Sequence, residues 1–394
     1  MRILQVNQFC GSKGGTELYV DLISNELLSR GHHVSLLCEQ PASNHREYKY
    51  KVHQIYGIAQ YFPKRDNDVM AALDRVVELE NPDVINTHNI HSSQVTQFFL
   101  KSRPTLRYVH DHTLFCPRGK HYDSGISCAH PFGVRCLLNS YVPFACFGAF
   151  SSRPWLTSRY FRSFDETIKT NRKLKKLLVA SKYMKTCLLQ NNFSDEMIEL
   201  LPYFTDVPDE ITPIGDHLLF VGRLIPEKGA HLLLDALSLL PDSSKLVIVG
   251  EGPQDYRSML VQRISRLNLK SRVRFAGAVE HSELAGFYQA CNLVVFPSIW
   301  PEPFGIVGIE ALSFGRPVVA FDSGGTRDWL AEGETGFVVP RGDVRALVEK
   351  VKHLLDSSEL ATAMGEKGRT MVAKDFNREV HMKRLLQIYH KICG

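Results

Sequence analysis

Two glutamates, Glu302 and Glu310, lie in the stretch of the chain with the strongest chemical signal, which runs from Phe296 to Gly325. They bracket the point where a helix is expected to begin after a proline-rich loop. The first N–H groups of a helix have no partner within it and can bind an anion. Here these groups belong to Phe304, Gly305 and Ile306, with the helix beginning near Phe304. The stretch therefore predicts a site for a phosphate group and a sugar.

Two cations precede this stretch and fit the same ligand. Arg223 and Lys228 follow a predicted strand that ends at Gly222. Cations at the carboxyl edge of a parallel strand can clamp a diphosphate. Because the sequence also predicts an anion-binding helix start near Phe304, we favour this interpretation over a pair of solvated surface cations. The loop after the next predicted strand contains Glu251 and is expected to line a base pocket. Val279 lies at the end of the predicted strand after that one.

The first half of the chain holds a second set of candidates. Gly14 and Gly15 precede a helix expected from Thr16. They form either a backbone nest for a phosphate or sugar or a plain turn with a threonine cap. The run His110–His112 follows a predicted strand, Leu106–Val109, and so falls on the ligand side of the sheet. Histidine and aspartate there can donate to, accept from or orient a hydroxyl.

Metal ions have two possible places. Four cysteines are concentrated in the stretch 113–153 and could bind a structural zinc: Cys116, Cys128, Cys136 and Cys146. They lack close C-x-x-C pairs, and the alternative is that they are buried free thiols. The D-x-D tripeptide Asp66–Asp68 precedes a strongly helical pattern, so we expect it to cap that helix. No metal cofactor is therefore expected for catalysis.

A basic segment, 153–185, carries interleaved aromatic side chains, among them Trp155, Tyr160, Phe161 and Phe164. This pattern suits an anionic membrane surface or a phosphorylated acceptor. A solvated helix face whose aromatic rings join the core is the alternative. No recognised nucleic-acid-binding module accompanies the charge, so nucleic acid is not expected as a partner.

Apolar strand-like runs alternate with amphipathic helical runs almost throughout the chain, which is the pattern of parallel βαβ units. An aperiodic segment, 203–216, contains two prolines and reads as a linker. We therefore expect an α/β protein with two doubly wound, Rossmann-like domains, 1–205 and 206–375. An amphipathic helix in 376–394 is expected to cross back onto the first domain.

Composition limits the protein class and its compartment. The chain has 394 residues, 44% hydrophobic and 23% charged, and a net charge of +5. These values are ordinary for a globular protein, and no apolar run is long enough to span a membrane. The nine cysteines are an odd number and do not predict a disulfide framework. The N-terminus reads as a strand and not as a signal peptide, so we expect a cytoplasmic protein.

Several motifs together resemble the family 4 retaining glycosyltransferases of GT-B fold. They are GRLIPEKG at 222–229, GEGP at 250–253, FPSIWPEPFGIVGIEALSFGRPVVA from Phe296 and the glycine pair 324–325. Glu302 and Glu310 have the E-x7-E spacing of that family. The resemblance is specific over 217–375 and looser for the N-terminal GGTE and for His110. It implies two Rossmann-like domains facing across a cleft, with a nucleotide-sugar donor bound mostly by the second.

The resemblance also implies roles for individual residues. The catalytic residues would be His110, Glu302, Arg223 and Lys228. The cations would neutralise the diphosphate in place of a metal. Glu310 would accept hydrogen bonds from the ribose, whereas Glu302 and His110 would contact the donor sugar. Further donor contacts would come from Gly14, Gly15, Glu251, Val279, Phe304, Gly305 and Ile306.

These residues favour a hexosyltransferase that moves a sugar from a nucleoside diphosphate to a glycan or lipid-linked acceptor. The family's usual mechanism retains the anomeric configuration by front-face attack. The sequence shows no obvious nucleophile, which is consistent with that mechanism. Cell-surface polysaccharide or glycoconjugate synthesis is the expected setting, with the protein peripheral on the inner face of the cytoplasmic membrane. A nucleotide-sugar epimerase of the same fold and a non-catalytic sugar-nucleotide binder are the alternatives.

Overall fold

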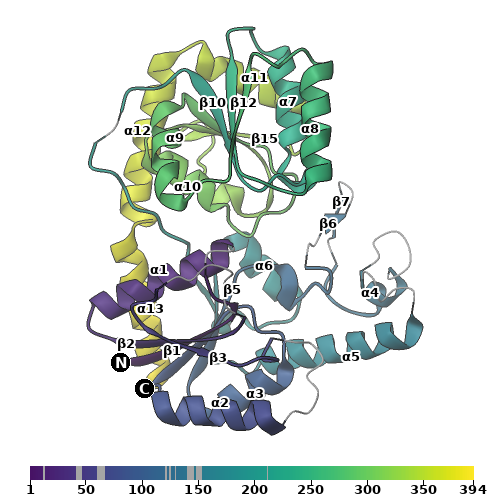
Figure 1. The fold of residues 1–394 in the computed structure, drawn as a ribbon, viewed down its shortest axis with the longest axis vertical. Coiled ribbons are helices and arrows are strands. Elements are labelled where there is room, and N and C mark those ends of the chain that lie inside the picture. Colours follow the sequence, from purple (N-terminus) through teal and green to yellow (C-terminus); the bar gives the residue numbers. More distant parts are fainter. Residues whose placement is uncertain are drawn as a thin grey trace. The chain divides into compact units, whose positions relative to one another are not determined.

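The computed structural model covers residues 1–394 and describes all of them except 12–13, 41–46, 60–66, 120–121, 124–125, 129, 140–145, 148–152 and 211. The chain divides into two compact units. The first unit comprises Met1–Asp123, Cys128–Leu201 and Met382–Gly394, and the second comprises Ser124–Ser127 and Pro202–His381. Each unit is a parallel sheet covered by helices (Figure 1).

The first unit contains a seven-stranded sheet in the order β3-β2-β1-β4-β5-β8-β9, in which every pairing is parallel. Its strands are β1 (Arg2–Phe9), β2 (His33–Gln40), β3 (Lys51–Gln54), β4 (Val84–Thr87), β5 (Thr105–Val109), β8 (Lys176–Val179) and β9 (Ile198–Leu200). A separate pair is formed by β6 (Tyr122–Asp123) and β7 (Ile126–Ser127). Because β1 and β4 are neighbours that continue the sheet in opposite directions, their carboxyl ends mark a switch point, the usual ligand position.

The helices of the first unit are α1 (Gly15–Ser29), α2 (Asn67–Glu80), α3 (Ser93–Ser102), α4 (Val134–Leu138), α5 (Pro154–Asn171) and α6 (Lys182–Gln190). Short 3-10 turns are η1 (His112–Leu114) and η3 (Asp195–Met197). Alternation along β1 separates its two faces. Leu4 and Val6 join an apolar cluster with α2 and α3, whereas Gln5 between them bonds to the C-terminal helix.

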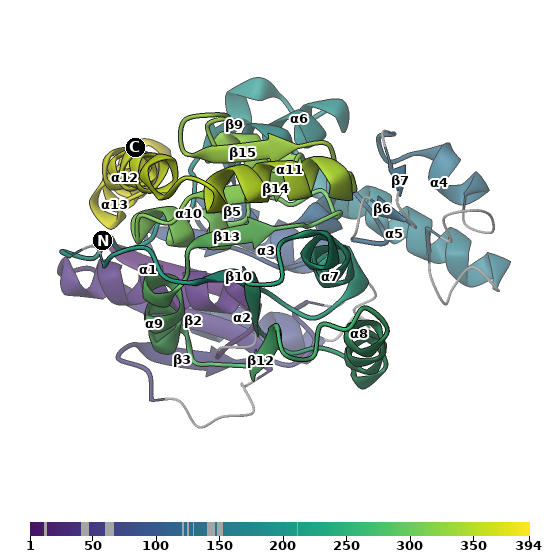
Figure 2. The same cartoon turned by 90° about the horizontal axis from the view of Figure 1, so that it is seen from above.

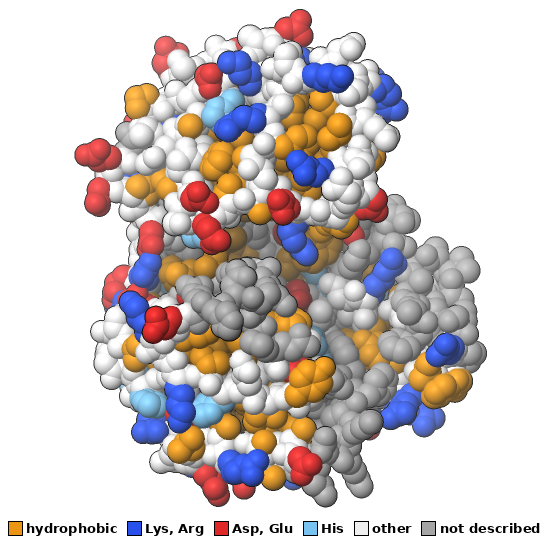
Figure 3. Space-filling model, in the orientation of Figure 1, with side chains coloured by type: hydrophobic (Ala, Val, Ile, Leu, Met, Phe, Trp, Pro, Cys, Tyr) orange, Lys and Arg blue, Asp and Glu red, His pale blue; other side chains and the backbone are white. Residues whose placement is uncertain are grey.

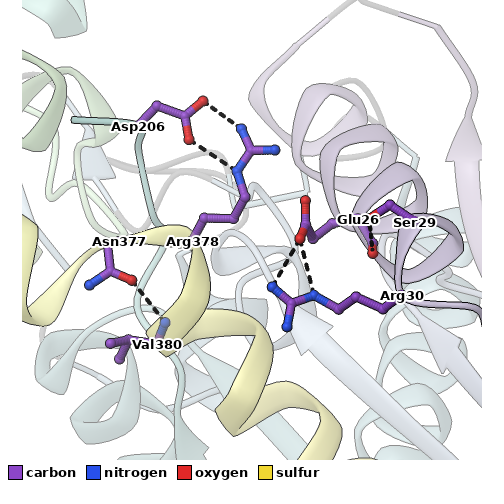
Figure 4. A network of polar contacts seen from close by, with 7 residues as sticks. All are labelled: Glu26, Ser29, Arg30, Asp206, Asn377, Arg378 and Val380. Atoms are coloured by element: carbon purple, nitrogen blue, oxygen red, sulfur yellow. Dashed lines mark hydrogen bonds and ion pairs between the residues drawn. The ribbon is translucent and has the colours of Figure 1, made fainter. Parts of the chain in front are cut away.

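That C-terminal helix, α13 (Arg378–Cys393), begins in the second unit and ends in the first. Asn377 Oδ1 accepts a hydrogen bond of 2.9 Å from the Val380 N–H and so caps its start. Arg378 donates to both carboxylate oxygens of Asp206 (Figure 4), at 3.0 Å from Nε to Oδ1. Near the other end, the Tyr389 hydroxyl accepts a hydrogen bond of 3.0 Å from Asn86 Nδ2.

Glu80, the last residue of α2, interacts with three basic side chains near the start of β2 and β3. Its carboxylate lies 3.0 Å from His33 Nε2, 2.8 Å from His53 Nε2 and 3.1 Å from Lys51 Nζ. Burial raises its pKa, but these three partners outweigh burial and hold the pKa at about 2, below the ordinary 4.5. The cluster therefore ties one end of α2 to the sheet edge.

The second unit contains a six-stranded parallel sheet in the order β12-β11-β10-β13-β14-β15. Its strands are β10 (His217–Val221), β11 (Lys245–Val249), β12 (Val273–Gly277), β13 (Leu293–Phe296), β14 (Val318–Phe321) and β15 (Gly336–Val339). Its helices are α7 (Ala230–Leu239), α8 (Gln254–Arg266), α9 (Leu284–Ala290), α10 (Ile306–Ser313), α11 (Val344–Leu355) and α12 (Ser358–Asp375). Helices α7, α8 and α11 lie on one side of the sheet, and α9, α10 and α12 on the other (Figure 2). Short 3-10 turns are η4 (Pro226–Lys228), η5 (His281–Glu283) and η6 (Gly324–Asp328).

The switch point of this second sheet lies between β10 and β13. The predicted ligand residues follow those two strands, so the fold brings Lys228 and Glu302 to the same edge. The described residues of the predicted linker, 203–216, contain no helix or strand.

Candidate active site

A glycine holds the two loops of the second unit's switch point together. Gly229, at the start of α7, has a left-handed conformation with φ of 73°. A Cβ atom at this position would lie 1.9 Å from the carbonyl oxygen of Pro297, the residue after β13. Only glycine permits this close approach. The contact places Lys228, one residue earlier, against the loop that carries Glu302.

Lys228 and Glu302 form a buried ion pair, with Lys228 Nζ 2.6 Å from Glu302 Oε1. The Glu302 side chain is 4% exposed and that of Lys228 is 18% exposed. Ser298 Oγ donates a second hydrogen bond of 2.6 Å to the same Oε1 atom. The ammonium of Lys228 also lies 5.3 Å from the ring centroid of Trp300. The pair is therefore fixed on several sides.

The backbone of Glu302 is held by the glycine pair after β14. The Gly325 N–H donates to the Glu302 carbonyl at 2.7 Å. Gly324 has φ of 60°, and a Cβ there would lie 2.2 Å from the same carbonyl oxygen. The predicted tight loop at 324–325 thus has a structural function, which is to position Glu302.

Helix α10 begins at Ile306, two residues after the predicted start at Phe304. Gly305 has a left-handed conformation, with φ of 99°. Its neighbour Phe304 is buried, and the Phe304 carbonyl accepts a hydrogen bond of 2.6 Å from Trp329 Nε1. No hydrogen bond joins the N–H groups of Phe304, Gly305 or Ile306 to another described residue. These N–H groups therefore keep the capacity to bind an anion.

Glu310 lies on α10 and is 5% exposed. Tyr288 Oη donates to its Oε2 at 2.7 Å, and His281 Nε2 lies 2.9 Å from its Oε1. Burial raises the pKa of Tyr288 well above its ordinary value, so the phenol keeps its proton. The hydrogen bond to Glu310 raises the pKa of His281. Both partners therefore donate hydrogen bonds to the side-chain oxygens of Glu310.

Three other predicted donor contacts lie at strand ends of the same sheet. Arg223 follows β10, is exposed and makes no ion pair or side-chain hydrogen bond with any described residue. Glu251 follows β11, and its backbone carbonyl accepts a hydrogen bond of 2.8 Å from the Leu224 N–H. Val279 follows β12 and is half-buried. Unlike that of Lys228, the side chain of Arg223 is therefore not engaged by any residue that the structure describes.

In the first unit, Gly14 and Gly15 stand at the start of α1, which begins one residue before the predicted Thr16. A Cβ at Gly15 would meet no atom within 4 Å, whereas one at Gly14 would lie 3.0 Å from Glu17 Oε2. The preceding residues 12–13 are outside the described part of the chain. Whether this turn binds a ligand stays a prediction.

His110 follows β5 and is 6% exposed. Its Nε2 lies 2.8 Å from Nδ1 of His88, which follows β4. Burial, reinforced by the charge of Arg107, lowers the pKa of His88 to about 3. Burial likewise lowers the pKa of His110 well below its ordinary value. Both imidazoles are therefore neutral at physiological pH.

The four cysteines of the predicted zinc site are half-buried and form no disulfide with any described residue: Cys116, Cys128, Cys136 and Cys146. Cys116, Cys136 and Cys146 pack against the apolar cluster around α5 and β8. The described residues contain no group of three or more His, Cys, Asp or Glu arranged to hold a metal ion. The structural zinc therefore stays a prediction.

The tripeptide Asp66–Asp68 is only partly described, because Asp66 lies outside the described residues. Helix α2 starts at Asn67, directly after it. Whether the tripeptide caps this helix stays a prediction.

The basic segment contains α5, whose aromatic residues divide between core and surface. Tyr160 and Phe164 are buried in the apolar cluster, and Phe161 packs against it. Trp155 is 66% exposed. The interpretation as a solvated face with core aromatics thus holds for Tyr160 and Phe164 but not for Trp155.

Sequence reasoning missed the partners of the two glutamates. Ser298 and Trp300 lie in the stretch around Glu302, so their proximity was a usable signal. His281 and Tyr288 precede Glu310 by more than twenty residues, and no local pattern links them to it. Only the packing of η5 and α9 beside α10 brings them together.

Comparison with known proteins assigns both halves of the chain. The profile of the glycosyl transferases group 1 matches residues 215–371, and that of glycosyltransferase family 4 matches residues 13–207. Together the two profiles account for nearly the whole chain.

Curated relatives match mainly over part of their length. Glycogen synthase of Mycobacterium tuberculosis is 32% identical over 178 residues, which are 44% of this chain and 42% of the synthase. D-inositol 3-phosphate glycosyltransferase of Corynebacterium glutamicum is 37% identical over 158 residues, 37% of each chain. The chain thus spans less than half the length of these two relatives.

Solved structures match over the full length. HepE of Anabaena, solved in complex with UDP, has a TM-score of 0.76 at 19% identity and covers 99% of this chain and 100% of its own. At this identity the likeness shows the fold. The expected GT-B fold, with two Rossmann-like domains, is confirmed.

Proposed function

Because the chain belongs to the glycosyl transferases of group 1 and family 4, we propose that it is a retaining glycosyltransferase that moves a sugar from a nucleoside-diphosphate sugar to a glycan or lipid-linked acceptor. The observation that carries this proposal is the buried set at the second switch point, in which Glu302 is paired with Lys228 and Glu310 lies eight residues later. Polar groups at such a point recognise a nucleotide ligand.

Lys228 and Arg223 neutralise the donor diphosphate in this proposal. Negative charge grows on the diphosphate as the glycosidic bond breaks, and fixed cations stabilise that charge. Two cations can supply what a metal ion supplies in other transferases, so we propose metal-independent catalysis. The N–H groups at the start of α10 add further donors.

The two glutamates bind different parts of the donor. Glu310 has both oxygens held by donors and still offers lone pairs to ribose hydroxyls. Glu302 binds hydroxyls of the sugar, and the family resemblance assigns His110 to the sugar as well. Neither glutamate is an acid or base of the glycosidase type. Retention would follow from front-face attack, with the leaving phosphate taking the proton of the acceptor hydroxyl.

The donor and the setting are proposed from relatives and surface chemistry. HepE has been solved with UDP and with UDP-glucose, so UDP sugars are the first donors to test. Synthesis of cell-surface polysaccharide or glycoconjugate fits a glycan or lipid-linked acceptor.

An anionic membrane surface is proposed as a further partner. Helices α4 and α5 contact one another and expose three large apolar side chains, Val134 at 68%, Leu138 at 70% and Trp155 at 66%. Exposed arginines, including Arg135 and Arg162, accompany them. Apolar groups among cations suit the interface of an anionic bilayer. On the face drawn in Figure 3, charges of both signs are scattered over the second unit. No helix in the described part of the chain is long and apolar enough to cross a bilayer.

Liposome sedimentation tests the membrane proposal. The protein should sediment with vesicles that contain anionic lipid and remain in solution with neutral ones. Trp155→Ala should weaken sedimentation, whereas Leu239→Ala, which removes an apolar side chain that is 61% exposed on the second unit, should not. Equal sedimentation with both lipid compositions would contradict the proposal.

Product analysis tests the proposed reaction. A thermal-shift screen of nucleoside diphosphates and their sugars finds the donor, because a ligand of the folded state raises its stability. The purified chain is then incubated with that donor and a membrane extract. The proposal requires release of the nucleoside diphosphate, a lengthened acceptor and retained anomeric configuration by NMR. An isomerised donor would indicate an epimerase, and a thermal shift without release would indicate a binder.

A further inference from the structure

A buried chain of hydrogen bonds reaches His110 from the middle of the first unit's sheet. His110 Nε2 lies 2.8 Å from His88 Nδ1, and His88 Nε2 lies 2.9 Å from Gln5 Oε1. Gln5 and His88 are fully buried, and His110 is 6% exposed. The three residues come from β1 and from the ends of β4 and β5, so the sheet fixes their spacing.

The far end of the chain sets its direction. Gln5 points its Nε2 at the Tyr389 hydroxyl on α13, 3.5 Å away, and therefore turns Oε1 toward His88. An amide oxygen only accepts, so His88 must donate from Nε2. A neutral imidazole has one N–H, which leaves Nδ1 of His88 as an acceptor. His110 must then donate from its own Nε2.

Two further contacts hold the ring of His110. Tyr108 stacks on it with centroids 4.5 Å apart and planes 19° apart. Tyr19 of α1 meets it edge-on at 5.4 Å. Both histidines are neutral because burial and the charge of Arg107 oppose protonation. The plane of the His110 ring is therefore fixed, and the neutral ring carries one proton, on either Nδ1 or Nε2.

We propose that His88, oriented by Gln5, is a positioning residue that keeps the proton of His110 on Nε2. In this tautomer Nδ1 of His110 is an acceptor, so any hydroxyl that reaches it donates a proton to the hydrogen bond. If the chemistry is the glycosyl transfer proposed above, His88 thereby sets which hydroxyl orientation of the sugar His110 binds. This consequence rests on the proposed function, whereas the tautomer does not.

The tautomer is measured directly by long-range 1H–15N NMR of the full chain with 15N-labelled histidine. The signal of His110 among the sixteen histidines is identified by its loss in His110→Gln. The wild-type spectrum should show Nε2 protonated and Nδ1 unprotonated. A spectrum with the proton on Nδ1, or with both nitrogens protonated at neutral pH, overturns the proposal.

Two substitutions of His88 separate positioning from structural support. His88→Gln keeps an acceptor for His110 and a donor for Gln5, so it should retain the Nε2–H signal of His110. His88→Leu removes the acceptor and should shift His110 toward a mixture of tautomers. His91→Leu is the control, because it removes a different buried histidine of the same loop. It should leave the His110 signal unchanged.

Kinetics complete the test once a donor is known. His88→Leu should lower kcat about tenfold or more, as loss of a group that orients a functional histidine does, while His88→Gln restores most of it. An unchanged kcat in His88→Leu, with the tautomer demonstrably lost, overturns the catalytic consequence. If no transfer is found at all, the proposed function fails, and the NMR result still decides the tautomer.

Discussion

Replacing Lys228 with methionine isolates the energy of the buried ion pair. The change removes the ammonium that lies 2.6 Å from Glu302. It leaves a carboxylate that is 4% exposed, with Ser298 as its remaining side-chain partner among the described residues. Breaking a buried pair from one side costs about 3 to 5 kcal/mol. Because the Lys228 side chain keeps 18% exposure, we expect the low end, about 3 kcal/mol. For a unit of this size that corresponds to a fall in Tm of about 6 to 12 °C.

Scanning calorimetry of four variants measures this cost: Lys228→Met, Glu302→Gln, the double variant and Lys270→Met. Glu302→Gln in the Lys228→Met background should recover most of the lost Tm, because it removes the stranded charge. Lys270→Met is the matched control, since Lys270 is exposed and without an ion pair to any described residue. The same Lys228→Met protein should bind UDP about 10- to 150-fold more weakly, the loss of one charged hydrogen bond. A fall in Tm no larger than that of Lys270→Met, or additive effects in the double variant, would refute the reasoning.

Three further predictions follow from local contacts. Glu80→Gln should destabilise the first unit by about 3 kcal/mol at pH 7. The folded pKa of about 2 lies below the ordinary 4.5. Urea titrations should therefore show the full difference in unfolding free energy between wild type and Glu80→Gln above pH 4.5, and this difference should disappear as pH falls toward 2. The hydrogen bond from Cys146 lowers the pKa of Cys136 to about 7, so alkylation of Cys136 followed by mass spectrometry should be half-maximal near pH 7. Protection that a chelator relieves, with bound zinc by elemental analysis, would instead support the metal site. Gly229→Ala should lower Tm by more than Lys228→Met, because its Cβ would lie 1.9 Å from the Pro297 carbonyl; an unchanged Tm would contradict the close approach.

The sequence predicts the sheets better than the helix starts. Buried strands such as β13 are continuous apolar runs, and both parallel sheets follow from the alternation of such runs with helices. The edge strand β3 occupies Lys51–Gln54, where partial exposure weakens the apolar signal. Helix α10 starts later than expected because Gly305 takes a left-handed conformation.

The candidate site follows from sequence only where its residues are close together in the chain or belong to a motif. Glu302 and Glu310 share one stretch, and Lys228 has a recognisable context. The pairing of Lys228 with Glu302 depends on the tertiary fold, since the two residues are 74 residues apart in the chain. The donors to Glu310 and the bond from His88 to His110 also cross between elements. No periodicity encodes these contacts, because each depends on which strand ends are neighbours.

The pairing of Lys228 with Glu302 has a consequence for donor binding. A diphosphate that engages Lys228 competes with a carboxylate 2.6 Å away, so part of its binding energy goes into loosening that bond. Arg223 has no such competitor among the described residues and is exposed. In the proposed function Arg223 would therefore make the first contact with the diphosphate, and Lys228 would engage afterwards. As Lys228 turned toward phosphate, Glu302 would regain a lone pair for a sugar hydroxyl. Binding of the diphosphate would thus prepare Glu302 for the sugar and couple recognition of the two halves of the donor.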